Sequence, residues 1–343
     1  MRAERLPNGL QAHGAPRPGQ GAGVGPRPGR GRWHLLGRVL TWAFFLLVLA
    51  LLARQARSID WSAVGDSLAR LPAAALVGAV LLTICSHALY ASYELIGRHL
   101  TGHGVPARRA LAIGAASYAF NLNLGSLIGG LALRYRLYAR SGLKAAQAAQ
   151  VIGASIATNW LGYLALAGML LAWRPLELPP SWRLDTAGLR WLGLAMMACA
   201  VAYLLACVLA PRRAWDWHGH RLTTPSARVA LLQLALSMLN WMTIAGVLWV
   251  LLQQRIDYPT VAAVLLVAAV AGVITHVPAG LGVLEAVFIA LLAHRLPEAE
   301  LLAALIAYRA IYYLAPLAIG GLLLWRLERA PRVTAPAAAP IKR

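Results

Sequence analysis

The sequence has few charged residues, and acidic residues are the rarest of them. Asp, Glu, Lys and Arg make up 13% of the 343 residues, and 12 acidic residues stand against 32 Lys and Arg. Soluble domains average about a quarter charged residues, because their surfaces face water. With 59% hydrophobic residues and a mean hydropathy of +0.62, the composition excludes an ordinary soluble globular protein.

Cysteine is also scarce, and the common catalytic motifs are absent. The three cysteines lie in apolar runs without CxxC spacing, so the sequence indicates neither a metal site nor a disulfide framework. The chain contains no GxSxG, HExxH or GxxxxGK(S/T) sequence, which argues against a hydrolase or an ATP-driven pump. We therefore expect no enzymatic activity and no cofactor.

Long apolar runs fill most of the chain. Runs near or above 18 residues can cross a hydrocarbon core about 30 Å thick, so the sequence predicts an all-α polytopic membrane protein. Shorter runs come in two pairs whose arms, at roughly 14–17 residues and about 1.5 Å per residue, barely reach across that core. We expect two re-entrant helical hairpins, at 110–139 and 259–294, among about eight elements. The six expected long helices are 33–53, 72–96, 145–173, 188–210, 229–252 and 300–325.

The two ends of the chain differ from its apolar middle. Residues 1–32 are rich in Gly, Pro and Arg, a composition that cannot bury a core and predicts a disordered cytoplasmic tail. Residues 329–343 form a second basic tail. The transmembrane domain is expected at 33–328, with an amphipathic connection at 58–72.

Lys and Arg are distributed unevenly between the loops. If the N-terminus is cytoplasmic, the inside segments carry 23 Lys and Arg and the outside segments carry 8. This bias predicts that both termini are cytoplasmic. It also accounts for the net charge of +20 without nucleic-acid binding, since basic loops are attracted to anionic lipid headgroups.

The order of the runs suggests an internal repeat. Each short pair follows two long spans and precedes one, and the two pairs enter the membrane from opposite sides. This order predicts an inverted-topology repeat with halves at about 33–180 and 181–328. An offset of 153 residues aligns Gly129 with Gly282, Leu143 with Leu296, and Gly168 with Gly321.

The second pair is divided by the sequence HVPAG. Pro278 cannot donate a backbone hydrogen bond, and Gly280 and Gly282 permit tight turns. Lipid cannot pair the backbone groups that such a break exposes, so we expect this tip to line a polar cavity. A proline-kinked, packed helix is the alternative, and His276 at the tip could be a ligand or a structural residue.

Glu285 is one of only two acidic residues within apolar runs, the other being Glu94. A charge at the bilayer centre costs at least about 2.5–3.5 kcal/mol, so Glu285 should have a partner, either Arg309 or Arg134. The pair could form a functional gate or only order the bundle. Protonation of Glu285, favoured by desolvation, would allow proton coupling.

The first pair turns at the sequence NLNLGS. Asn121 and Asn123, with Gly125 and Gly129 nearby, form its expected tip, and their amides could bind a lipid headgroup or pair with broken backbone. Arg134 is the deepest basic residue that follows, and its planar fork suits a phosphate group.

Three tyrosines lie close to Arg309 in the sequence AYRAIYYLAP: Tyr308 before it, and Tyr312 and Tyr313 after it. We expect Tyr308 and Tyr312 to line the cavity or to pack in the core.

The two segments HVPAGLGVLEAVFIALL and AALIAYRAIYYLAPLAIGGLLL closely resemble the second hairpin and last helix of the YbhN-like inner-membrane proteins. This family is also called the lysylphosphatidylglycerol synthase transmembrane-region or flippase-like family. Its first motif resembles NLNLGSLIGGLALRYRLYARSGL, with Arg134 at the basic position, although NLNLG stands where many members have proline. The residues that match the pattern Pro-x-Gly-x-Gly-x-x-Glu and the following Tyr-Arg are Pro278, Gly280, Gly282, Glu285, Tyr308 and Arg309.

The resemblance covers about residues 35–328 and implies a multi-pass protein of the bacterial inner membrane that moves lipids between leaflets. Anionic or modified phospholipids are the expected substrates, and a separately encoded lipid synthase is an expected partner. The sequence lacks the large soluble aminoacyl-transfer domain of true synthases, so we do not expect it to make lysyl-lipid. The alternatives are a secondary transporter of a small solute, a scaffold for a lipid-synthesis enzyme, and an intramembrane enzyme using Glu285 and His276.

Overall fold

The computed structural model describes seven parts of the chain, and α-helices form nearly all of them. The expected first span at 33–53, both expected tails, Gly129 and His276 lie outside the described residues. The exception to the helical architecture is a short antiparallel hairpin of β1 (Ala214–Trp217) and β2 (His220–Thr223). The described parts are 60–125, 130–176, 186–209, 214–217, 220–223, 225–275 and 277–329.

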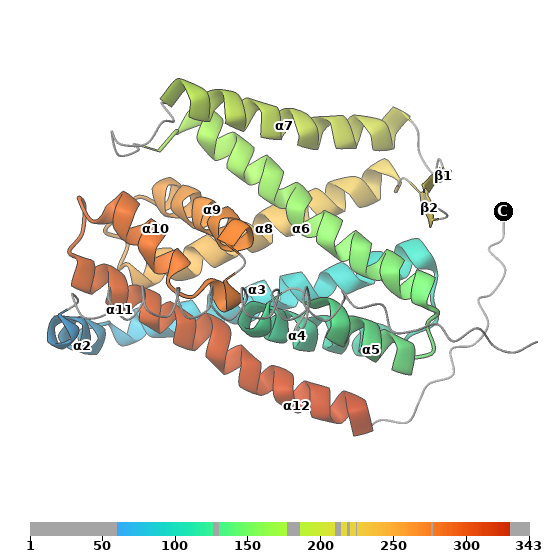
Figure 1. The fold of residues 1–343 in the computed structure, drawn as a ribbon, viewed down its shortest axis with the longest axis horizontal. Coiled ribbons are helices and arrows are strands. Elements are labelled where there is room, and N and C mark those ends of the chain that lie inside the picture. The colour runs from blue at the N-terminus through green and yellow to red at the C-terminus, as the bar shows by residue number, and fades with distance from the viewer. Residues whose placement is uncertain are drawn as a thin grey trace, which may run out of the picture. The chain divides into compact units, whose positions relative to one another are not determined.

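The order of the helices along the chain can be followed in Figure 1. Two irregular turns interrupt the second half of the chain, the 3₁₀ turn η2 and the π turn η3. In chain order the elements are α2 (Trp61–Ala69), α3 (Ala73–Thr101), α4 (Ala107–Leu124), α5 (Leu133–Arg140), α6 (Ala145–Trp173), α7 (Thr186–Leu209), α8 (Ala227–Leu251), α9 (Tyr258–Thr275), η2 (Pro278–Gly280), α10 (Val283–Leu292), α11 (Glu298–Tyr308), η3 (Arg309–Leu314) and α12 (Ala315–Arg329).

Six helices among the described residues are long and apolar enough to cross a membrane. Five of them confirm long spans expected from the sequence: α3, α6, α7, α8 and the continuous stretch from α11 to α12 at 298–329. The sixth is α9, which the sequence assigned to a hairpin arm. Its 18 residues and apolar composition are also compatible with a complete crossing.

Local sequence explains where several helices begin and end. The Asp60 carboxylate caps α2 by accepting hydrogen bonds from the Ser62 and Ala63 backbone N–H groups, both at 3.1 Å. The Ser62 hydroxyl and the Ala63 N–H together lower the pKa of Asp60, which keeps the cap ionised. Gly102 ends α3 in a left-handed conformation with φ 63°, which glycine adopts without steric penalty.

The long helices pack closely through small residues. Helix α3 packs against α4, α6 and α8, and α7 packs mainly on α6. A Cβ atom on Gly162 would lie 2.2 Å from the Ser237 hydroxyl of α8, and one on Gly168 would lie 2.8 Å from the Gly193 carbonyl of α7. Glycine therefore sets the spacing of α6 from both neighbours, as is common between membrane helices.

The middles of α3 and α8 meet in the core. The Ser86 hydroxyl donates to the Asn240 side-chain oxygen at 2.7 Å, and both residues are fully buried. The two helices start 154 residues apart, at Ala73 and Ala227, and α6 and α11 start 153 residues apart. The crossing of α3 and α8 thus places the two halves of the chain against each other.

Candidate functional site

A tight turn separates α9 from α10 at the sequence VPAGLG. Gly280 and Gly282 have φ angles of 55° and 77°, which glycine tolerates because it has no Cβ atom. Ala279 also has a positive φ, 57°, in a region that costs a residue with a side chain about 1–2 kcal/mol. The turn therefore needs an external contact to hold Ala279 in this conformation.

Arg309 supplies that contact. Its Nη1 donates to the Ala279 carbonyl at 3.1 Å, and its Nη2 donates to the Gly280 carbonyl at 2.9 Å. Nη2 also donates to Glu285 Oε2 at 3.0 Å, while Nε donates to Glu285 Oε1. These bonds use four of the five N–H donors of the guanidinium. Of the two partners considered for Glu285, the structure therefore selects Arg309.

The Glu285–Arg309 pair is only partly buried. The side chains are 19% and 15% exposed, respectively. Glu285 lies in the first turn of α10, where the helix dipole favours a negative charge. The Tyr313 ring lies 5.3 Å from the guanidinium carbon of Arg309, close enough for a cation–π contact. The charges of Glu285 and Arg309 are thus compensated, although both side chains remain partly exposed.

Arg309 begins the π turn η3, in the middle of the last long helix. The Ala315 N–H bonds to the Ala310 carbonyl, five residues back. Pro316 explains part of this geometry, because it has no N–H to donate to the Tyr312 carbonyl four residues earlier. Single π turns inside α-helices often occur at functional sites.

The end of α4, in the first half of the chain, reaches the same place. The Asn123 amide donates to the Ala119 carbonyl at 2.8 Å and to the Tyr313 carbonyl of η3 at 3.1 Å. Asn123 therefore pairs with backbone. Asn121 faces Gly130, where a Cβ atom would lie 2.8 Å from the Asn121 oxygen. Helix α4 also contacts η2, so the Asn-bearing end of α4, the η2 turn and the π turn lie together.

Arg134 lies in a separate ion pair with Glu94. Its Nη1 is 3.3 Å from Glu94 Oε1, and the side chains are only 3% and 0% exposed. The Tyr138 hydroxyl donates to the other Glu94 oxygen, and the Arg134 guanidinium lies 5.8 Å from the Tyr90 ring centre. The apolar runs of the sequence contain two carboxylates and two arginines. Equal numbers of the two could have indicated two ion pairs rather than one.

The predicted tyrosines lie in the core. Tyr308 and Tyr312 are 2% and 0% exposed, and their rings stack 5.1 Å apart. The Tyr312 hydroxyl lies 2.7 Å from the Ser86 hydroxyl and 2.8 Å from the Tyr118 hydroxyl. The His87 ring lies about 5 Å from the rings of both Tyr118 and Tyr312. Ser86 and Tyr118 were not predicted, since a single polar residue in an apolar helix carries no distinctive pattern.

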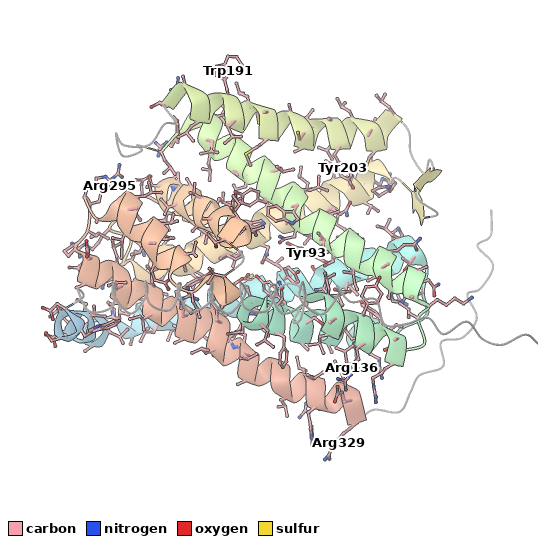
Figure 2. All side chains as sticks on the ribbon, viewed as in Figure 1. Tyr93, Arg136, Trp191, Tyr203, Arg295 and Arg329 are labelled. Carbon is pink, nitrogen blue, oxygen red and sulfur yellow. The ribbon has the colours of Figure 1, made fainter. Side chains whose placement is uncertain are left out.

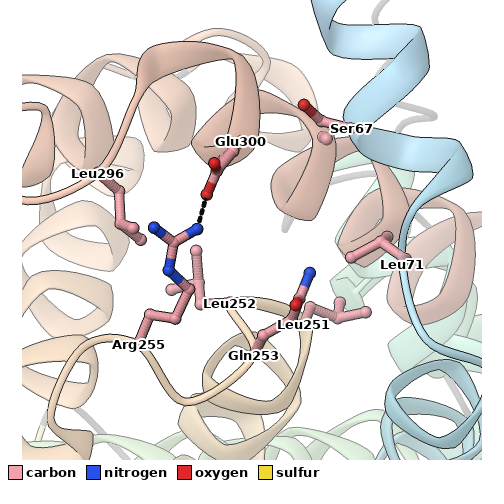
Figure 3. A pocket seen from close by; sticks show the side chains of 9 residues that line it. Ser67, Leu71, Leu251, Leu252, Gln253, Arg255, Leu296 and Glu300 are labelled. Atoms are coloured by element: carbon pink, nitrogen blue, oxygen red, sulfur yellow. Dashed lines mark hydrogen bonds and ion pairs between the residues drawn. The ribbon is translucent and has the colours of Figure 1, made fainter.

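A small pocket lies away from all of these residues, between α2, the end of α8 and α11 (Figure 3). Its polar wall is the Arg255–Glu300 ion pair, whose side chains are 49% and 37% exposed. None of the predicted site residues lines it. We therefore assign the candidate site to the convergence of α4, η2, α10 and η3.

The six long apolar helices among the described residues define a multi-pass membrane protein, and two ion pairs lie between its helices. The chain belongs to the family of the lysylphosphatidylglycerol synthase transmembrane region, whose family model matches residues 37–320. It is 41% identical to the inner membrane protein YbhN of Escherichia coli over 298 residues, which is 87% of this chain and 94% of the relative. It is 30% identical to the uncharacterized protein slr0712 of Synechocystis over 289 residues, 83% of this chain and 89% of that protein. The resemblance read from the sequence motifs is thereby confirmed.

Proposed function

We propose that the protein moves anionic or modified phospholipids between the leaflets of the bacterial inner membrane, without catalysing a covalent reaction. The observation that carries this proposal is the environment of Arg309. A guanidinium halfway along an apolar helix is shared between a carboxylate and two backbone carbonyls of a tight turn. Its fork also suits a phosphate group, the group common to phospholipid headgroups.

We further propose an inverted repeat with two re-entrant hairpins. In a molecule with a two-fold axis, residues near the axis contact their own equivalents. Ser86 and Asn240 are 154 residues apart, the same offset that relates the starts of α3 and α8, and they contact each other at 2.7 Å. This contact supports a pseudo-two-fold axis through the crossing of the two helices.

A second pair of contacts supports the same repeat. The His87 ring of α3 packs on Tyr312 of the last helix. Trp241 and Asn159 stand 154 and 153 residues from them, and the Trp241 N–H donates to the Asn159 carbonyl at 3.2 Å. In the proposed repeat, the contact of α3 with η3 corresponds to the contact of α8 with α6. The side chains that make the two contacts differ.

Both termini are proposed to be cytoplasmic. Figure 2 shows Arg136 and Arg329 at the end of the bundle where α5 and α12 finish, and Arg295 at the opposite end. Arg136 and Arg329 both belong to segments assigned to the inside, and their position at one end supports this orientation.

In the proposed mechanism, the two hairpin tips close a midplane cavity from opposite sides. A headgroup phosphate binds Arg309 by replacing the Ala279 and Gly280 carbonyls, which releases the turn and opens the gate. Glu285 balances the charge of Arg309. Arg134 can meet a phosphate only after its pair with Glu94 opens, so we assign the first contact to Arg309. Rocking of one half against the other alternates access.

The test is lipid transfer in proteoliposomes with head-labelled phosphatidylglycerol and cardiolipin. We expect the wild-type protein to transfer lipid and the Glu285→Gln variant to lose transfer at equal folding yield. Glu300→Gln is the matched control, because it makes the same substitution in the more exposed pair with Arg255 and should keep transfer. Transfer no faster than in empty liposomes, with or without a pH gradient, would overturn the proposal and favour a solute transporter or a scaffold.

A further inference from the structure

Three side-chain contacts and a short stretch of backbone join the two ion pairs. The Arg134 guanidinium lies over the Tyr90 ring at 5.8 Å, and Tyr90 stacks on Tyr118 with ring centres 3.7 Å apart. The Tyr118 hydroxyl lies 2.8 Å from the Tyr312 hydroxyl, and Tyr312 belongs to the π turn that begins with Arg309. The series therefore runs from α5 through α3 and α4 to η3.

The Tyr312 hydroxyl is the point where this series branches. It lies 2.7 Å from the Ser86 hydroxyl of α3, and Ser86 in turn donates to Asn240 of α8. All three residues are fully buried. Because a buried polar group that loses its partner costs about 1–3 kcal/mol, a displacement of Tyr312 must shift α3 and α4 or break their hydrogen bonds.

The π turn differs from an α turn in its hydrogen bonding, which spans five residues instead of four. Conversion to an α turn would shift one side of the helix by one residue, about 1.5 Å and 100°. Pro316 opposes the α register, since it cannot pair with the Tyr312 carbonyl. At the other end of the turn, Arg309 is held by Glu285 and by the Ala279 and Gly280 carbonyls. A change in the partners of Arg309 therefore biases the element that carries Tyr312.

We propose that Tyr312 and Tyr118 are positioning residues that couple the two ion pairs. A change at Glu285 and Arg309 then alters the packing of α5 around Arg134. This coupling goes beyond lipid movement and applies to whatever substrate the protein carries. In a carrier that opens to one side at a time, it keeps the two hairpins from opening together.

Hydrogen–deuterium exchange of the full-length protein in lipid nanodiscs tests the coupling. We expect Glu285→Gln to speed amide exchange in the turn at 277–283 and also in α5 at 133–140, the latter by about two- to thirtyfold. In a Tyr312→Phe background, which keeps the ring but removes the hydroxyl, the turn should still respond and α5 should not.

Tyr163→Phe is the matched control. Its hydroxyl is also buried and donates to the Leu266 carbonyl at 2.9 Å, outside the series, so both responses should persist in this background. If Tyr312→Phe does not fold, Tyr118→Phe removes the same hydrogen bond from the other side. The proposal is overturned if α5 never responds to Glu285→Gln, or responds equally without the Tyr312 hydroxyl. The readout needs no lipid transfer, so failure of the proposed function gives a separate result.

Discussion

The two interior ion pairs differ in how they are compensated. Arg134 and Glu94 are sealed from their surroundings, where a tyrosine hydroxyl donates to Glu94 and an aromatic ring lies near Arg134. Arg309 and Glu285 are partly exposed, and Arg309 also binds the backbone of a turn with left-handed residues. A sealed pair resists exchange because each ion would be left uncompensated. We therefore expect a structural role for the first pair, and we expect the second pair to be the one that can exchange its partners.

Breaking the sealed pair should have the largest effect on stability. Glu94→Gln leaves the Arg134 charge buried without its carboxylate, so we expect the free energy of unfolding to fall by about 3–5 kcal/mol. Replacing both residues with apolar ones, as Glu94→Leu with Arg134→Met, should recover much of that loss. Denaturant unfolding in mixed detergent measures both variants. A loss below about 1 kcal/mol for Glu94→Gln would contradict a sealed pair.

Breaking the partly exposed pair should have a smaller effect on stability and a larger effect on lipid transfer. Glu285→Gln should lower the free energy of unfolding by only about 1.5–3 kcal/mol, which is typical of the loss of a hydrogen bond to a charged group. The loss is smaller than for Glu94→Gln because the side chains of this pair are partly exposed. Lipid transfer by this variant should be slower than by the wild-type protein and slower than by any variant that only perturbs stability. The same unfolding assay, run beside the transfer assay, makes the comparison. Greater destabilisation by Glu285→Gln than by Glu94→Gln would remove the distinction between the pairs.

The strain at the turn gives a smaller and opposite effect. Ala279→Gly should strengthen the closed turn by about 1 kcal/mol, because glycine adopts φ 57° without a Cβ clash. Amide exchange at 277–283 should slow accordingly. Ala286→Gly, the same change inside α10, should instead weaken its helix by about 1 kcal/mol. Equal destabilisation by both substitutions would show that Ala279 carries no strain.

The surface pair provides the smallest effect. Arg255 and Glu300 are 49% and 37% exposed, and exposed ion pairs contribute about 0–1 kcal/mol. Glu300→Gln should therefore change the free energy of unfolding by less than about 1 kcal/mol, and added salt should reduce even that difference. If Glu300→Gln lowered the free energy of unfolding as much as Glu285→Gln, solvent exposure would not explain the order of the three ion pairs.

Much of the helical layout was predictable from local sequence. Apolar runs located the long helices to within a few residues, because a helix must satisfy its own backbone groups wherever lipid surrounds it. The unusual sequence VPAGLG marked the turn before α10 for the same reason. The length of α9 was harder to interpret, because 18 apolar residues are compatible with both a hairpin arm and a full crossing.

The sequence identified the charged residues that need partners, but it did not identify which residues pair. Rarity of charge in apolar runs singled out Glu285, Glu94, Arg134 and Arg309. Sequence could not decide which carboxylate meets which arginine, since both arginines satisfied the requirement for a partner. The hydroxyl contact of Tyr312 with Tyr118 was also beyond reach, because it joins residues 194 positions apart.

The sequence by itself determined the membrane class of this protein, its family, the positions of its long helices and the existence of interior charges. Composition and hydrophobic length suffice for the membrane class and the long helices, because the bilayer imposes them on any chain, and the motifs around Glu285 and Arg309 indicated the family. Only the tertiary structure decided that Arg134 is sealed against Glu94 while Arg309 holds a turn, and that a π turn links the two through tyrosines. Lateral packing sets those distances, and it depends on the shapes of several helices at once.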